Sequence, residues 1–154
     1  MAIISATMVE VCIFSRKRTR VRYLLLRRSW DEKIYPNLWQ FVTGSIEKGE
    51  TAWAAAGREM MEETGMKPNV LWVVPYVNPF YDPAWDSVNL MPLFAAEVGE
   101  DRDPILSPEH ESFAWLSYEK AMSRLVWPGQ KRGLEIIHDF IAKGKNSEHI
   151  KRIP

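Results

Sequence analysis

Four glutamates and one arginine are spaced so that they could act together: Glu50, Arg58, Glu59, Glu62 and Glu63. In a helix, Glu59, Glu62 and Glu63 fall within an arc of about 100°. Three like charges on neighbouring turns repel one another, and a divalent cation would relieve that repulsion. Carboxylate oxygens suit Mg²⁺ or Mn²⁺, whereas zinc prefers His and Cys. The spacing alone therefore leaves two interpretations open, a metal site and a solvated acidic face.

A single helix must carry these carboxylates, and the sequence predicts it over residues 52–64. Thr51 suits the N-cap, and Gly65 suits the left-handed residue that ends a helix. Glu50 and Arg58 are expected to form an ion pair that ties loop 44–49 to the helix. The helix face opposite the glutamates is the one we expect to dock on a sheet, and it carries Trp53, Ala54, Met60 and Met61.

Strands must provide the rest of the scaffold. Apolar and alternating runs predict strands over residues 5–14, 21–28, 39–43, 70–77, 88–98 and 113–116, with a hairpin between the first two. A helical period marks residues 129–142, and the turn-rich, aromatic stretch 78–86 predicts a surface loop. Strands and helices alternate along the chain, which favours a mixed sheet covered by helices.

The residues from Gly44 to Met66 resemble the Nudix box without a departure. That box reads Gly, five residues, Glu, seven residues, Arg-Glu, an apolar residue, any residue, Glu-Glu, any residue, Gly, an apolar residue. The resemblance implies an α+β fold, the Nudix-type α/β/α sandwich with a mixed β-sheet. It also implies hydrolysis of a nucleoside diphosphate linked to another group, X, with Mg²⁺ as the cofactor and Mn²⁺ as a substitute.

The resemblance also assigns roles around the box. Glu62 and Glu63 are the catalytic candidates, and the sequence leaves open which of the two is the general base. Stretch 107–110, followed by Trp115 and Leu116, resembles bacterial dihydroneopterin triphosphate and dATP pyrophosphohydrolases, in which a Glu before a His adds a metal ligand. The implied metal ligands are thus Glu59, Glu62, Glu63 and Glu109, whereas Glu50, Arg58 and Gly65 are structural. All three histidines are interpreted as ordinary.

Candidate substrate-binding residues lie outside the helix. Arg27 and Arg28 end a strand that resembles the phosphate-facing strand of these enzymes, and alternation sends only one of them to a given face. Tyr81 and Trp85 lie in the predicted loop, where stacking on a base or pterin and packing at a dimer contact are both open. The remaining candidates are Trp39, Gln40 and Gly44.

These residues support three hypotheses. The first is hydrolysis of a nucleoside or pterin triphosphate to a monophosphate and pyrophosphate. The second is a Nudix hydrolase of dinucleoside polyphosphates or nucleotide sugars. The third is a Nudix domain that binds nucleotides without turnover, which usually has a degraded box.

Composition limits the remaining possibilities. The 154 residues predict one Nudix domain over residues 1–143 and a polar C-terminal tail over 144–154. Twenty basic residues balance twenty acidic ones, which argues against a nucleic-acid polymer or a membrane surface as partner. Neither a membrane-spanning run nor a signal-peptide pattern is present, and the single Cys12 is expected to be buried. We therefore expect a cytoplasmic protein with a small-molecule nucleotide substrate and a possible homodimer.

Overall fold

The computed structural model describes residues 1–144 and 147–154. Its strands are β1 (Ile3–Ser5), β2 (Met8–Lys17), β3 (Arg20–Arg28), β4 (Trp39–Gln40), β5 (Val42–Ser45), β6 (Val70–Asp82), β7 (Ser87–Val98), β8 (His110–Leu116) and β9 (Arg152–Ile153). Its helices are α1 (Ala52–Thr64), α2 (Tyr118–Arg124) and α3 (Pro128–Ile136), and α3 continues as a π-helical segment over Ile137–Ala142. No helix in the described ranges is long and apolar enough to span a membrane.

The strands form one mixed sheet, as the sequence predicts. The path β4-β3-β2-β7-β6-β9 is extended by β1 on β7, β5 on β2 and β8 on β3. The pairs β2–β7 and β1–β7 are parallel, and the other pairs are antiparallel. The predicted strand over residues 39–43 is split at Phe41, because its first half pairs with β3 and its second half with β2.

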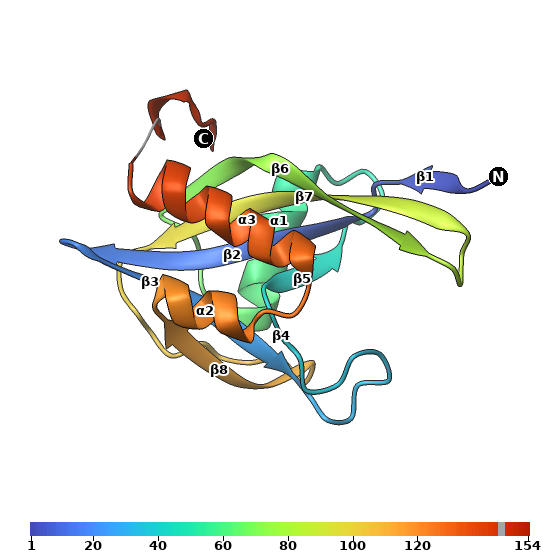
Figure 1. The fold of residues 1–154 in the computed structure, drawn as a ribbon, viewed down its shortest axis with the longest axis horizontal. Helices are drawn as coiled ribbons and strands as arrows, with labels where there is room; N and C mark the ends of the chain where they lie inside the picture. The colour runs from blue at the N-terminus through green and yellow to red at the C-terminus, as the bar shows by residue number, and fades with distance from the viewer. Residues whose placement is uncertain (145–146) are drawn as a thin grey trace.

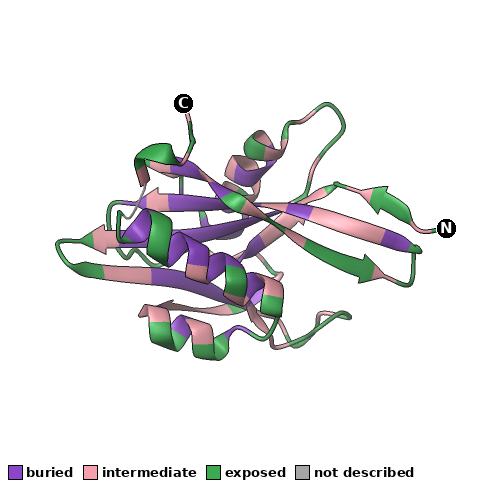
Figure 2. Cartoon of the chain, turned by 45° about the horizontal axis from the view of Figure 1, so that its top comes forward, coloured by how far each residue is buried: buried purple, intermediate pink, exposed green. Residues whose placement is uncertain are grey.

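Helices cover both faces of this sheet, so the fold is a three-layer sandwich (Figure 1). Alternation along β2 separates two cores. Val11 and Ile13 pack on the face covered by α1, whereas Cys12 and Phe14 pack on the face covered by α2 and α3. Figure 2 shows this burial concentrated where helices lie on the strands. Cys12 is fully buried, as expected.

Helix α1 begins and ends where the sequence predicts. Thr51 accepts a hydrogen bond from the Ala54 N–H at 3.3 Å, and Gly65 adopts φ 69°. The predicted docking face is confirmed at Met60, which is fully buried, but it is wrong at Trp53. Ala55, Ala56 and Met60 are buried, whereas Trp53 is 48% exposed. The alanines let the helix backbone approach the sheet closely, and this leaves the bulky indole outside.

The expectation of a surface loop over residues 78–86 is also wrong. Strands β6 and β7 pair as far as Asp82 and Ser87, so only a tight turn over residues 83–86 remains. Pro75 falls within a register shift between Val73 and Val77, where no regular ladder bond is required. The turn-forming residues are therefore accommodated inside a long hairpin, whose tip projects beside β1 (Figure 1).

The C-terminal tail is structured in part. Within the described residues, Ser147–His149 form a 3₁₀ turn and β9 pairs with Leu71 and Trp72 of β6. Helix α2 was missed by the sequence interpretation because it is short and buries only Ala121.

Candidate active site

The three helix glutamates differ in their exposure, although they share one face of α1. The side chain of Glu62 is 55% exposed, that of Glu59 is 13% exposed and that of Glu63 is 4% exposed. This gradient arises because α1 rests on the sheet along the Ala55–Ala56 side, which turns Glu63 inward. The acidic face is therefore not simply a solvated surface.

Gly44 on β5 lies directly beneath Glu59. A Cβ atom on Gly44 would lie 2.0 Å from Cδ and 2.4 Å from Oε1 of Glu59, so no other residue type leaves that carboxylate in place. This close approach explains the glycine that begins the box. Gly44 was predicted to bind substrate. In this structure its lack of a side chain leaves room for the Glu59 carboxylate.

Arg58 links the box loop to the acidic face. Its Nε and Nη2 donate to the two oxygens of Glu50 at 2.9 Å each, and Nη2 also donates to the Ser45 carbonyl at 2.7 Å. Its Nη1 donates to Glu59 at 2.9 Å and lies 3.3 Å from Glu62. The predicted ion pair between Glu50 and Arg58 is confirmed, and the guanidinium also offsets part of the repulsion among the glutamates.

Glu50 is held in its ionised form by these contacts. The hydrogen bonds from Arg58, together with one from the Glu47 N–H, lower the pKa of Glu50 from 4.5 to about 2. Because both of its oxygens accept hydrogen bonds, the Glu50 carboxylate holds the loop against α1. This agrees with the structural role that the resemblance implies.

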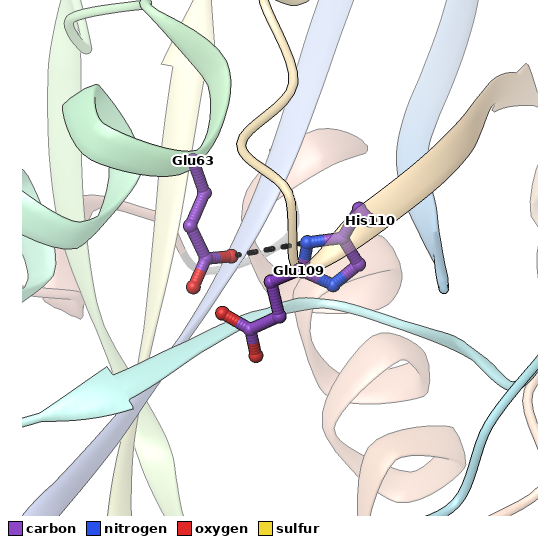
Figure 3. A group of neighbouring side chains, drawn as sticks. All are labelled: Glu63, Glu109 and His110. Atoms are coloured by element: carbon purple, nitrogen blue, oxygen red, sulfur yellow. Dashed lines mark ion pairs between the residues drawn. The ribbon is translucent and has the colours of Figure 1, made fainter. Parts of the chain in front are cut away.

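A second group of ligand atoms comes from the start of β8. Glu63, Glu109 and His110 each offer one atom, and these atoms lie within 4.8 Å of one another (Figure 3). Glu63 Oε2 and His110 Nδ1 are 3.8 Å apart, and both are buried without a hydrogen-bond partner among the described residues. The structure thus brings Glu109 next to the helix carboxylates, across 46 residues of sequence.

The electrostatics of this cluster fit a cation. Burial, together with the charges of Glu109 and Glu59, raises the pKa of Glu63 from 4.5 to about 9. Burial is also the largest cause of the raised pKa of Glu59. Crowded, partly buried oxygen donors, one of them unpaired, suit a hard divalent ion. Glu59, Glu63 and Glu109 could therefore hold a metal ion.

Gln40 and His110 form a buried pair beside the cluster. The Gln40 amide nitrogen lies 2.9 Å from His110 Nε2, and the imidazole is fully buried. Burial and the charge of Arg28 lower the pKa of His110 to about 4, so the ring is neutral at neutral pH. Gln40 was predicted to bind substrate; in this structure its amide contacts His110 instead.

Only one of the two predicted arginines faces the carboxylates. Arg28 donates to Glu109 at 3.1 Å and to Glu32 at 3.1 Å, and it lies opposite His110 across the β3–β8 ladder. Arg27 points to the other face, where it pairs with Glu111 at 3.3 Å. A register shift between Arg27 and Arg28 leaves one extra residue in β8.

Trp39 lies with Arg27 on the face covered by α2. Its ring is flanked by the guanidinium groups of Arg27, at 5.8 Å, and of Arg124, at 4.7 Å. Trp39 and Arg27 are therefore separated by the sheet from the helix glutamates. This division follows from strand alternation, which places Gln40 on the face of α1.

Tyr81 and Trp85 lie at the tip of the β6–β7 hairpin. Trp85 is 78% exposed and Tyr81 is 55% exposed, and the Tyr81 hydroxyl donates to Asp86 at 3.0 Å. In Figure 1 the tip projects away from the edge where β3 and β8 meet. The rings are free of the core, but no contact joins them to the carboxylates within the part of the chain that the structure describes.

Sequence reasoning missed an aromatic pair on another loop. Tyr35 and Trp127 pack edge to face with ring centres 4.9 Å apart, and both are exposed. Arg28 donates to the Ile34 carbonyl at 3.1 Å, which anchors the Tyr35 loop beside Glu109. The two residues are separated by 92 positions, so no local sequence pattern predicts their contact, and it appears only in the folded structure.

The comparisons with known proteins agree with this geometry. The NUDIX domain family model matches residues 6–140. A relative named octanoyltransferase, from Myxococcus xanthus, is 32% identical over 128 residues, which are 79% of this chain and only 33% of that protein. The chain thus spans about a third of that relative's length.

Two other relatives are covered more fully. Nucleoside triphosphatase NudI of Enterobacter sp. (strain 638) is 27% identical over 104 residues, or 63% of this chain and 74% of that protein. An RNA pyrophosphohydrolase of Francisella tularensis subsp. mediasiatica (strain FSC147) is 26% identical over 148 residues, or 81% of this chain and 96% of that protein.

A solved structure supports the fold as well. The E. coli dihydroneopterin triphosphate pyrophosphohydrolase superposes with a TM-score of 0.72 at 25% identity, covering 88% of this chain and 96% of that one. Together with the complete box, the family match over most of the chain shows that this protein belongs to the Nudix family and is a pyrophosphohydrolase.

Proposed function

We propose that this enzyme hydrolyses a nucleoside or pterin triphosphate to a monophosphate and pyrophosphate, using Mg²⁺ or, as a substitute, Mn²⁺. The observation that carries the proposal is the convergence of Glu59, Glu63 and Glu109 beside Arg28. The carboxylates offer hard oxygen ligands, and a guanidinium suits phosphate oxygens. The nucleoside triphosphatase and the dihydroneopterin triphosphate pyrophosphohydrolase described above support a triphosphate substrate.

Glu59, Glu63 and Glu109 would hold the cation, with Glu62 at the exposed end of the same face. When bound, the cation supplies charge neutralisation on the substrate phosphates and a lower pKa for the attacking water. Arg28 would bind the phosphates that leave, because its guanidinium lies beside Glu109 on the α1 face. Arg58 remains engaged with Glu50 and keeps the box loop in place.

The reaction requires one proton acceptor. The water oxygen forms a bond to phosphorus, the bridging P–O bond breaks, and the bridging oxygen leaves with the pyrophosphate. The proton of the water passes to a carboxylate of this chain. Both Glu62 and Glu63 remain candidates, since Glu62 is open to solvent and Glu63 has the raised pKa.

Replacing each glutamate by glutamine distinguishes these roles. Glu62→Gln and Glu63→Gln are each expected to lower kcat by at least ~10²-fold, the usual scale for loss of a general base. If one variant also requires more Mg²⁺ for activity, the glutamate replaced in it is a metal ligand. The glutamate replaced in the other variant is then the general base. Near-normal turnover in both variants would contradict the proposed mechanism.

Recognition of the group X requires a flat apolar surface. We propose the exposed rings of Tyr81 and Trp85 for this role, as the sequence suggests. A second candidate is the pair Tyr35 and Trp127, which is favoured by the anchoring of its loop to Arg28. Stacking on either surface is worth roughly 1–3 kcal/mol per base in other proteins.

A substrate panel tests the proposal. Nucleoside triphosphates and dihydroneopterin triphosphate are compared with a dinucleoside polyphosphate, a nucleotide sugar and a 5′-triphosphorylated RNA, each with Mg²⁺ and with EDTA. We expect pyrophosphate release from a free triphosphate and no turnover in EDTA. Preference for the RNA would move the substrate class toward that of the Francisella relative. Turnover in EDTA, with metal shown to be removed, would contradict the metal-dependent proposal.

A further inference from the structure

The buried pair of Gln40 and His110 determines where the imidazole proton lies. The Gln40 amide nitrogen can only donate, and it lies 2.9 Å from His110 Nε2. Nε2 must then accept, so it carries no proton, and the proton of the neutral ring lies on Nδ1. A doubly protonated ring would bring two donors together at Nε2, which this geometry disfavours.

The protonated Nδ1 faces Glu63. The Nδ1 atom of His110 is 3.8 Å from Oε2 of Glu63, and each atom is buried without a hydrogen-bond partner in residues 1–144 and 147–154. This separation is longer than a hydrogen bond, but such contacts commonly shorten when a substrate complex forms. A small movement of either side chain would form a hydrogen bond from His110 Nδ1–H to Glu63 Oε2 and give both buried atoms a partner.

The same proton argues against His110 as a metal ligand. His110 is one of three residues, with Glu63 and Glu109, that each offer a possible ligand atom, and its Nδ1 is the atom that lies 3.8 Å from Glu63 Oε2. A ring nitrogen that carries a proton has no lone pair to give to a metal. His110 could ligate through Nδ1 only if the Gln40 amide were reversed.

We infer that Gln40 fixes the proton of His110 on Nδ1, and that His110 positions the Glu63 carboxylate through this N–H instead of binding a metal ion. Its effect on turnover rests on the proposed function, whereas the position of the proton does not. Both residues are held by strands that pair with β3, so their orientation is set by the sheet. His110 is therefore a positioning residue that acts through Glu63.

The proton position can be measured directly. Long-range ¹H–¹⁵N spectra of the metal-free protein with ¹⁵N-labelled histidine identify which ring nitrogen is protonated, and loss of one signal set in His110→Asn assigns it. We expect a protonated Nδ1 and an unprotonated Nε2, unchanged by added Mg²⁺. In Gln40→Glu, where the neighbouring group accepts, Nε2 should gain a proton. A wild-type proton on Nε2, or loss of the Nδ1 proton on adding Mg²⁺, would overturn the inference.

Turnover tests the positioning role. His110→Asn retains an N–H donor near the place of Nδ1, whereas His110→Leu fills the space without one. We expect His110→Leu to lower kcat by about 10- to 100-fold with KM unchanged, and His110→Asn to recover most of that loss. His138→Asn is the matched control, because His138 is another buried histidine, bonded to Tyr23 at 2.7 Å, and it should leave kcat unchanged.

Equal losses in folded His110→Asn and His110→Leu would overturn the positioning role. If the wild-type enzyme turned over no substrate in the panel, the proposed function would fail, but the NMR experiment would still decide the proton position. The two failures are thus distinguishable.

Discussion

Replacing Glu63 by Gln should change how the stability of the metal-free protein depends on pH. Burial and the neighbouring carboxylates raise the pKa of Glu63 from 4.5 to about 9. The folded protein therefore retains a proton that the unfolded chain releases above its ordinary pKa. The stability associated with protonated Glu63 is complete below 4.5 and is lost progressively as pH rises toward the folded pKa. Gln has the shape of the protonated acid and does not titrate.

The magnitude follows from one proton. Between the two pKa values, the free energy of unfolding of the wild type should fall by up to about 1.4 kcal/mol per pH unit relative to Glu63→Gln. This slope depends only on the number of protons released on unfolding. It is therefore a stronger test than the total change in the free energy of unfolding, which also depends on the two pKa values. The variant should be close to the wild type in mild acid and more stable above neutral pH.

Urea unfolding from about pH 5 to about pH 8.5, in EDTA and then in Mg²⁺, measures this difference. A bound cation requires ionised carboxylates, so Mg²⁺ should stabilise the wild type, by about 2.7 kcal/mol at a hundredfold excess over Kd, and should stabilise the variant less. Glu10→Gln is the matched control. Burial raises the pKa of Glu10 to about 7, but Glu10 bonds Asn78 on the opposite face of the sheet.

For Glu10→Gln, the free energy of unfolding should differ from the wild type in its pH slope only up to about neutral pH, where folded Glu10 loses its proton. Mg²⁺ should stabilise this variant as much as it stabilises the wild type. Parallel pH profiles for the wild type and Glu63→Gln would show that folded Glu63 does not retain its proton. Equal stabilisation of both by Mg²⁺ would refute the assignment of Glu63 as a metal ligand.

Three further predictions concern the surroundings of the site. Gly44→Ala should displace the Glu59 carboxylate, whose Cδ lies 2.0 Å from the new Cβ, and raise the Mg²⁺ requirement by at least about 10-fold. Gly57→Ala, in open space on α1, should stabilise the protein by about 0.5–1 kcal/mol and leave that requirement unchanged. Arg58→Lys should weaken the stability that Glu50 contributes above its ordinary pKa of 4.5, so thermal unfolding should lose part of its dependence on pH between about 2 and 4.5. Trp85→Ala should raise KM by about 5- to 150-fold for a ringed substrate and leave a simple polyphosphate unaffected; equal losses would indicate a role in the fold or a dimer contact.

Local geometry explains what the sequence alone could predict. The ends of α1, the shared face of its glutamates and the Glu50–Arg58 pair follow from helix caps and from a fixed rotation per residue. The separation of Arg27 from Arg28 follows in the same way from side-chain alternation along a strand, and the mixed sheet follows from the order of strands and helices along the chain. These features need only neighbours in the chain, or residues within about two helical turns.

Tertiary structure decided the features that depend on distant partners. The docking face of α1 was set by how closely Ala55 and Ala56 could approach the sheet, and not by the larger apolar surface of Trp53. The long β6–β7 hairpin formed because β7 offered a continuous partner strand that turn propensity does not reveal.

The contact between Gln40 and His110 joins residues 70 positions apart and arises only because β4 and β8 both pair with β3. An imidazole that the sequence marks as ordinary thereby comes to lie beside Glu63. The helix and strand periods determine which face of its own element a residue occupies. The pairing of strands determines which residues from different elements become neighbours. Glu63 Oε2 and His110 Nδ1, the buried atoms without a hydrogen-bond partner, face each other only because of that pairing.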